Sequence, residues 1–210
     1  MSTPMPILTA QLDRSFQLSA FGGIEPAASA HPSRLAARLD PALAPATLEQ
    51  LQKSPRLQPR LTELLFDVAS KHSDWGPDLL RGNDPQRAAF LAGSVWHARS
   101  LLKLVSRSDL TALIGYIGAD AHKFGIRHLA HSVANRLIAD PEKLAHQIEH
   151  DGHACLGAWL NNNSVMERNR VLLRLPVGTA AENPKPEHRN VSGQLFSLVM
   201  AYFEAEKPLI

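Results

Sequence analysis

The histidines of this sequence offer the widest range of chemistry. The chain contains ten of them, and three fall close together as His146, His150 and His153. Histidines four residues apart on a helix can share a zinc ion, and an imidazole can gain or lose a proton near neutral pH. This spacing makes a helical metal-dependent enzyme one hypothesis for the function.

The helix that would carry these three histidines argues against a metal site. One side of it is apolar at about 100° per residue, and consists of Leu144, Ile148, Cys155 and Trp159. The histidines fall on the opposite side, where we expect them to face water. An exposed face gives an ion no enclosed cavity, and the glutamate spacing of helical zinc proteases is missing. We therefore predict a solvated histidine face, with neither a metal nor a cofactor.

A second histidine group consists of His122, His128 and His131. The same reasoning predicts a solvated face here. Two alternatives stay open if the two groups face each other across a helix hairpin. They are weak binding of zinc or nickel, and a surface that responds to pH.

The candidate nucleophiles Cys155 and Ser94 lack the surroundings that would activate them. Cys155 shares the apolar side of its helix, whereas a reactive thiol needs exposure and a neighbouring cation. Ser94 follows a glycine but has neither the flanking glycines nor the strand of a nucleophile elbow. With no phosphate-binding loop either, the sequence predicts a protein that is not an enzyme.

Trp75 is the one residue that the sequence suggests for binding a partner. It stands beside Gly76-Pro77 in a segment, 71–83, that is rich in helix breakers and is expected to be a loop. A tryptophan in a loop can anchor a protein interface. The alternative is that this loop packs back on its own domain.

Helical signals dominate the elements that must position these residues. Asp-Pro pairs at 40–41, 84–85 and 140–141 combine a capping carboxylate with a proline suited to the first turn, so each is expected to open a helix. A capping box at Thr47 and apolar spacing of three and four residues complete the pattern. The predicted helices are 47–53, one through 61–68, 85–105, 108–117, 121–138, 141–160 and a last one from about 191. Residues 170–175 fit either a helix end or a short strand.

Length and composition favour one mostly α domain. The 210 residues, 44% of them hydrophobic, can bury a single core. We expect residues 1–30 to be loosely structured and residues 31–210 to form one compact multi-helix domain, with room for one or two short strands. The formal net charge is only +2 and the basic residues are scattered, which argues against nucleic acid as the partner.

The start of the chain and its apolar segments bear on its location. No segment is long and apolar enough to cross a bilayer, and the first residues do not resemble a secretory signal. Cys155 is the only cysteine, which excludes an internal disulfide. These features predict a cytoplasmic protein without membrane insertion.

Several segments resemble the SctK family of type III secretion proteins, whose members include YscK and PscK. They are Ser15-Phe-Gln-Leu, Arg87-Ala-Ala-Phe-Leu-Ala-Gly, Gly157-Ala-Trp-Leu and Arg170-Val-Leu-Leu-Arg-Leu-Pro176, followed by a polar loop and a last helix. The overall length of about 210 residues also fits, and the resemblance covers most of the chain. Residues 19–46 depart from it, because they hold fewer aromatic residues than the family pattern.

The resemblance implies a non-enzymatic adaptor of the injectisome sorting platform. Such a protein lies in the bacterial cytoplasm, peripheral to the inner membrane. It connects the cytoplasmic domain of the SctD-type ring protein to the SctQ-type pod protein, and indirectly to SctL and the SctN ATPase. The family brings no catalytic residues. A chaperone or regulator of secreted proteins is the other non-enzymatic alternative.

Overall fold

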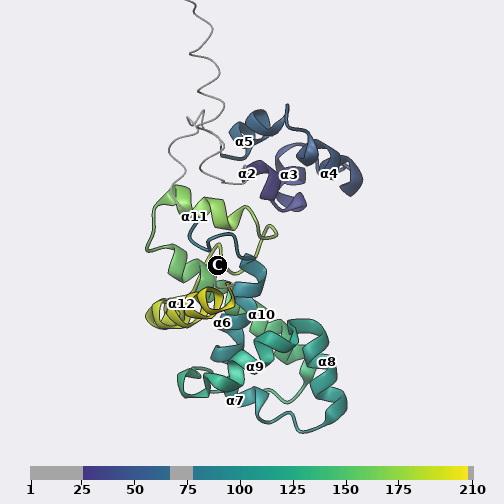
Figure 1. The fold of residues 1–210 in the computed structure, drawn as a ribbon. Coiled ribbons are helices and arrows are strands. Elements are labelled where there is room, and N and C mark those ends of the chain that lie inside the picture. Colours follow the sequence, from purple (N-terminus) through teal and green to yellow (C-terminus); the bar gives the residue numbers. More distant parts are fainter. Residues whose placement is uncertain (1–25, 67–77, 208–210) are drawn as a thin grey trace, which may run out of the picture.

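The computed structural model describes residues 26–66 and 78–207, and within these ranges the fold is helical without strands (Figure 1). The mostly α fold is therefore confirmed. The helices are α2 Pro26–Ser29, α3 Pro32–Arg38, α4 Pro45–Lys53, α5 Gln58–Phe66, α6 Pro85–Trp96, α7 Ala98–Leu101, α8 Arg107–Ile117, α9 Ala119–Arg127, the 3-10 helix η1 Leu129–His131, α10 Pro141–Leu160, α11 Val165–Leu172 and α12 Pro186–Glu206.

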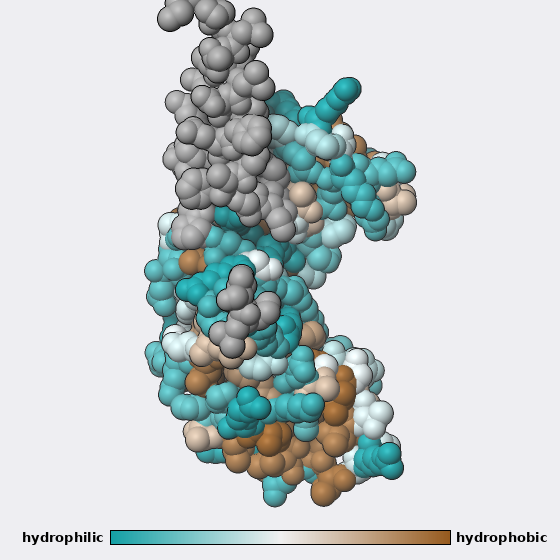
Figure 2. Space-filling view, in the orientation of Figure 1, coloured by the Kyte–Doolittle hydropathy of each residue, from teal (hydrophilic) through white to brown (hydrophobic). Residues whose placement is uncertain are grey.

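The helices form an elongated arrangement with α2–α5 at one end and α7–α9 at the other (Figure 1). Helices α6, α10 and α12 lie between these ends. The face of the molecule shown in Figure 2 is largely hydrophilic, except near α7–α9, where hydrophobic residues gather. None of the described helices is both long enough and apolar enough to cross a bilayer.

Two of the three Asp-Pro pairs open helices as predicted. Asp84 accepts hydrogen bonds from the first turn of α6, and Asp140 does the same for α10. The prediction is wrong at Asp40, whose side chain accepts from Ala42 N in a turn. Helix α4 begins later, at Pro45, because the fixed φ of this proline suits the first helical position. The capping box predicted at Thr47 consequently lies inside a helix and is also wrong.

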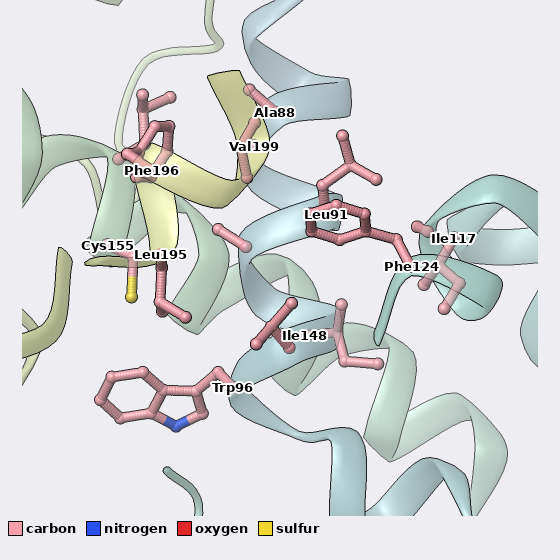
Figure 3. Packing of buried hydrophobic residues seen from close by; sticks show 14 of the residues in the cluster. Ala88, Leu91, Trp96, Ile117, Phe124, Ile148, Cys155, Leu195, Phe196 and Val199 are labelled. Carbon is pink, nitrogen blue, oxygen red and sulfur yellow. The ribbon is translucent and has the colours of Figure 1, made fainter. Parts of the chain in front are cut away.

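The main core lies where α6 is enclosed by its neighbours (Figure 3). Leu195 and Phe196 of α12 pack on one side of α6 beside Cys155 of α10, while Ile117 and Phe124 of α8 and α9 pack on the other. Glycines at the crossing of α6 and α10 bring the two backbones into direct contact. Helix α10 is thereby covered on several sides, and every residue from 151 to 158 is buried.

Helices α2–α5 pack around a second, smaller cluster of buried apolar residues. Its members are Ala27, Ala30, Leu35, Leu48, Leu61, Leu65 and Leu173. Leu173 follows α11, and its carbonyl accepts from His31 N at 2.7 Å. Arg34 donates to the carbonyls of Leu175 and Pro176 and pairs with Glu182. These bonds join the cluster to the rest of the chain. Of the predicted loose segment 1–30, the structure describes residues 26–30, which include α2.

The predicted helix 85–105 is broken at His97, so this prediction is wrong in its second half. The carbonyl of Trp96 does not continue the helix, because it accepts from Val133 N at 3.2 Å, Ala134 N at 3.0 Å and the Ser132 hydroxyl at 3.1 Å. The short helix α7 then follows, and the exposed segment 102–106 leads to α8. The carbonyl of Trp96, which a continuing helix would use for its bond to the residue four positions on, is bonded instead to residues 132–134.

The predicted helix 121–138 is likewise too long. Helix α9 starts at Ala119 and ends at Arg127, and after η1 the chain runs without regular structure to Asp140. Leu137, expected to point inward, is 50% exposed. The backbone of this segment bonds across to Trp96 and Ser100 instead of to itself. The open choice at 170–175 is settled as a helix end, because α11 ends at Leu172 and turns follow.

Candidate functional site

Asp151 is the centre of a buried polar cluster in the middle of α10. Its side chain is only 10% exposed, and four side chains contact its two oxygens. His97 Nε2 lies 2.8 Å and Gln147 Nε2 3.0 Å from Oδ2. His150 Nδ1 lies 3.1 Å and His188 Nε2 3.3 Å from Oδ1. The carboxylate accepts from all four groups, which satisfies a buried charge.

The partners of Asp151 come from three different parts of the fold. Gln147 and His150 belong to α10, His97 stands at the break between α6 and α7, and His188 lies in the first turn of α12. Trp96 stacks on the ring of His188 with 4.7 Å between centroids. The cluster thus connects the end of α6, the middle of α10 and the start of α12, three helices that contribute to the main core. The break at His97 has a structural consequence, because it turns this imidazole toward Asp151.

Burial and hydrogen bonding act in opposite directions on Asp151. Burial raises the pKa of its carboxyl group, but the bonds from His188, His97, Gln147 and His150 outweigh it. The net result is a pKa well below the usual range of an aspartate. Hydrogen bonds to the ionised form have this effect, so Asp151 carries its charge throughout the physiological pH range.

The geometry of this cluster favours helix pairing over catalysis. The bonded nitrogens of His97, His150 and His188 all point at the carboxylate of Asp151. Across the described ranges, no three or more His, Cys, Asp or Glu side chains form a group able to hold a metal. Cys155 lies one turn after Asp151, and burial, aided by the charge of Asp151, raises the pKa of its thiol far above the usual value. Such a thiol is a poor nucleophile.

The structure separates the three histidines that suggested a metal. His146 and His150 are exposed, in line with the expected solvated face. His153 is buried, and its Nε2 lies 2.8 Å from Gln86 Oε1 of α6. The expectation that it faces water is wrong, because α6 covers the polar side of α10 in its second half. Burial, opposed in part by the charge of Glu149, lowers the pKa of His153.

The second histidine group is half-buried. His122 lies in α9, while His128 and His131 flank and end η1, with ring centroids 6.3 Å apart. Nδ1 of His131 lies 3.0 Å from the amide nitrogen of Gln194 on α12. Burial lowers the pKa of His122 and of His128, which disfavours their charged forms.

An apolar surface lies at the end of the molecule that contains α7–α9 (Figure 2). Leu102 is 51%, Val105 94% and Leu137 50% exposed. Leu137 belongs to the segment that crosses α7, where Ile138 N bonds to the Ser100 hydroxyl at 3.2 Å. The three side chains therefore lie at the same end of the fold. We call them the apolar end. Trp75, the partner-binding residue suggested by the sequence, lies outside the described residues.

Two curated proteins match the chain over its full length. Both are named nodulation protein NolU, one from Sinorhizobium fredii (strain NBRC 101917 / NGR234) and one from Rhizobium fredii. Each is 66% identical over 212 residues, which covers 99% of this chain and 100% of the relative. The chain belongs to the NolU family. No family profile and no solved structure matches this NolU-family chain.

Three of the segments that carry the resemblance to SctK proteins, 87–93, 157–160 and 170–176, contribute residues to the main core of this NolU-family chain, whereas Ser15-Phe-Gln-Leu lies outside the described residues. Gly157 contacts the backbone of Ala181 so closely that a Cβ would lie 2.0 Å from its carbonyl oxygen. Trp159 stacks on Phe196 of α12 with 4.7 Å between centroids. Arg174, which follows α11, pairs with Asp78 and also donates to the carbonyl of Asn83. The resembling residues thus pack the helices against one another.

Proposed function

We propose that this NolU-family chain is a non-enzymatic adaptor of a bacterial type III secretion apparatus. In this role it lies in the cytoplasm at the inner membrane and joins the cytoplasmic domain of an SctD-type ring protein to an SctQ-type pod protein. SctL and the SctN ATPase are then indirect partners.

The observation that carries this proposal is the way in which reactive groups and apolar surface are distributed. Asp151 and its imidazole partners are committed to one another, and the thiol of Cys155 is buried with a raised pKa. The apolar end, by contrast, exposes side chains that could be covered by another protein. A chain with this distribution is suited to holding proteins together.

The resemblance to SctK proteins and the relatives support the same role. The segments that resemble SctK proteins lead us to expect that the chain lies in the sorting platform, between the ring protein and the pod protein. The relatives are named for nodulation, and a secretion adaptor in a bacterium that associates with plants is compatible with that name. Location, partners and the lack of catalysis are all parts of this proposal.

Binding measurements with purified proteins test the adaptor role. The full chain is titrated with the ring protein's cytoplasmic domain and, separately, with the pod protein of the same bacterium. The proposal expects saturable binding to at least one of them, and a ternary complex when all three are mixed. Failure to bind either protein would refute it.

The same purified chain distinguishes the alternatives. A chaperone or regulator would bind secreted substrates and leave the ring and pod proteins unbound. A metal-dependent enzyme would purify, without a tag, with a stoichiometric metal that is lost when His146, His150 and His153 are replaced by alanine. The separation of His153 from the other two gives no support to that second alternative.

A further inference from the structure

Four cations accompany the apolar end. Arg99 lies in α7, Lys103 follows Leu102, Arg107 begins α8 and Arg136 precedes Leu137, and all four are exposed. Among the described residues, none of the four has a carboxylate within ion-pair distance. Asp109, in the first turn of α8, is the nearest carboxylate in sequence and accepts from Ser108. The end therefore combines exposed apolar groups with positive charge that this part of the chain leaves unbalanced.

Several cations in other parts of the described chain are paired with carboxylates. Arg87 forms a bidentate pair with Glu206, with nitrogen–oxygen distances of 2.7 and 2.8 Å, and also contacts Asp120 at 3.1 Å. Arg34 and Arg174 pair with carboxylates from distant parts of the sequence. The fold thus supplies acidic partners for these three arginines, whereas the described residues supply none for the four cations at the apolar end.

The backbone explains why these apolar side chains cannot turn inward. Segment 102–106 connects α7 to α8, and only Leu104 in it is buried, at 8% exposure. Leu104 points into the core, whereas Val105 beside it is 94% exposed. Leu113 and Ile117 already fill the core-facing side of α8. The exposed groups therefore have no place in the chain's own core.

Resting on the proposed adaptor role, we propose that the apolar end and its four cations form the docking surface for a carboxylate-rich face of a protein partner in the secretion apparatus. Protein interfaces place apolar anchors at the centre and arginines around them, and three of the four cations are arginines. A guanidinium binds a carboxylate through two parallel hydrogen bonds. Carboxylates of an acidic partner would therefore form the ion pairs that these cations lack within the described chain.

The structure favours a protein over an anionic membrane as the occupant. A membrane-surface anchor usually presents the free apolar face of an amphipathic helix. Here α7 has only 4 residues, and Leu113 and Ile117 of α8 are buried in the core, which leaves Tyr116 as the large exposed hydrophobic residue of α8. Leu102, Val105 and Leu137 lie instead on two connecting segments, which fits a local contact with a shaped protein surface.

Single and double substitutions test the docking surface in the full chain. Val105→Asp places a carboxylate in the centre of the contact, and Lys103→Glu with Arg107→Glu reverses two of its charges. Matched controls are Val165→Asp, at another exposed valine, and Arg56→Glu, near the opposite end of the molecule. The readout is the Kd for the ring protein's cytoplasmic domain and for the pod protein, at two salt concentrations.

We expect each apolar-end variant to weaken binding to one of the two proteins by about tenfold or more, as loss of a central interface residue does. The controls should bind like the unmodified chain, and raising the salt concentration should weaken binding of the unmodified chain but affect the charge-reversed variant less. Circular dichroism should show equal folding, since all substituted side chains are exposed.

Three outcomes would overturn the inference, and each has its own signature. Unchanged binding by both apolar-end variants would remove the docking surface and leave the adaptor role in place. Failure of the unmodified chain to bind either protein would remove the adaptor role and the docking surface together. Binding to phosphatidylglycerol vesicles that Val105→Asp abolishes, with protein binding unaffected, would assign this end to a membrane.

Discussion

Replacing Gly152 by alanine tests the close contact between the backbones of α6 and α10. This glycine lies in α10 where the helix crosses α6, and a Cβ on it would stand 2.0 Å from the carbonyl oxygen of Ala89 and 2.7 Å from its carbonyl carbon. Side-chain Cβ atoms essentially never approach other heavy atoms to less than 3.0 Å. The methyl group fits only if the two helices move apart by on the order of 1 Å, which also loosens the packing around them.

The sign of the effect follows from two opposing contributions. Alanine in a helix interior is favoured over glycine by about 1 kcal/mol. Forcing extra volume into a packed core costs about 1–3 kcal/mol or more, and the upper part of that range applies because the obstacle is backbone. Gly152→Ala should therefore lower the free energy of unfolding by about 2 kcal/mol, or Tm by about 4–8 °C for a chain of this size.

Gly193 of α12 provides the matched control. It lies inside a long helix, and a Cβ on it would meet nothing within 4 Å. Gly193→Ala should therefore stabilise the protein by up to about 1 kcal/mol through helix propensity alone. Urea denaturation followed by circular dichroism and by tryptophan fluorescence measures both variants. Stability of Gly152→Ala equal to that of Gly193→Ala would refute the contact between α6 and α10.

Three further predictions concern the polar and reactive groups of α10. Asp151→Asn should lower the free energy of unfolding by about 2–4 kcal/mol at pH 7, measured by urea denaturation, because buried donors lose a charged acceptor. Since the folded pKa of Asp151 lies below its ordinary 3.8, the difference between the two proteins should shrink as pH falls below about 4; a constant difference would contradict this. The pKa of His153 is lowered in the folded state, so stability should fall as pH drops below its ordinary 6.5, and denaturation curves of His153→Gln should show a weaker fall. Cys155 should react with a thiol reagent in urea but not in buffer, and rapid reaction of the folded chain would contradict its burial.

Helix starts were predictable where a local signal decides them. The caps at Asp84 and Asp140 use only the residue itself and the next turn, so sequence spacing was sufficient to find them. Asp40 shows the limit of this reasoning. Its carboxylate caps a turn, and a proline 5 residues further on starts the helix. Two equally local signals competed, and sequence spacing alone does not rank them.

The errors at 97–105 and 128–138 have one common cause. Both segments contain apolar residues at helical spacing, which is why each was predicted to continue a helix. In the fold, these segments run beside each other, and Trp96 O, immediately before the first, accepts from Val133 N and Ala134 N of the second. A contact between residues about 37 positions apart replaced bonds between residues four apart. Hydrophobic periodicity indicates helical bonds between residues four apart, and it does not indicate contacts between distant segments.

The buried cluster was also missed, although one signal for it was present. At about 100° per residue, Asp151 falls among Leu144, Ile148 and Cys155 on the apolar side of α10. A charge in that position has to be paired or hydrogen-bonded when the helix is buried. The histidines on the other face of α10 are the more conspicuous pattern in this sequence. His97 and His188 could not have been named, since they lie 54 and 37 residues away and nothing in their own neighbourhoods marks them.

Asp151 and the apolar end differ in whether the fold itself pairs or covers their side chains. The carboxylate of Asp151 lies deep enough for three helices to bring donors to it, so its charge stabilises the fold and has no remaining capacity for another molecule. Val105 and the four cations of the apolar end are exposed, and no described carboxylate pairs with these cations. Because the free energy of covering such groups is still available, a partner that covers them gains it on binding. The proposed adaptor role would use both features, with Asp151 holding the core together and the apolar end available to a partner.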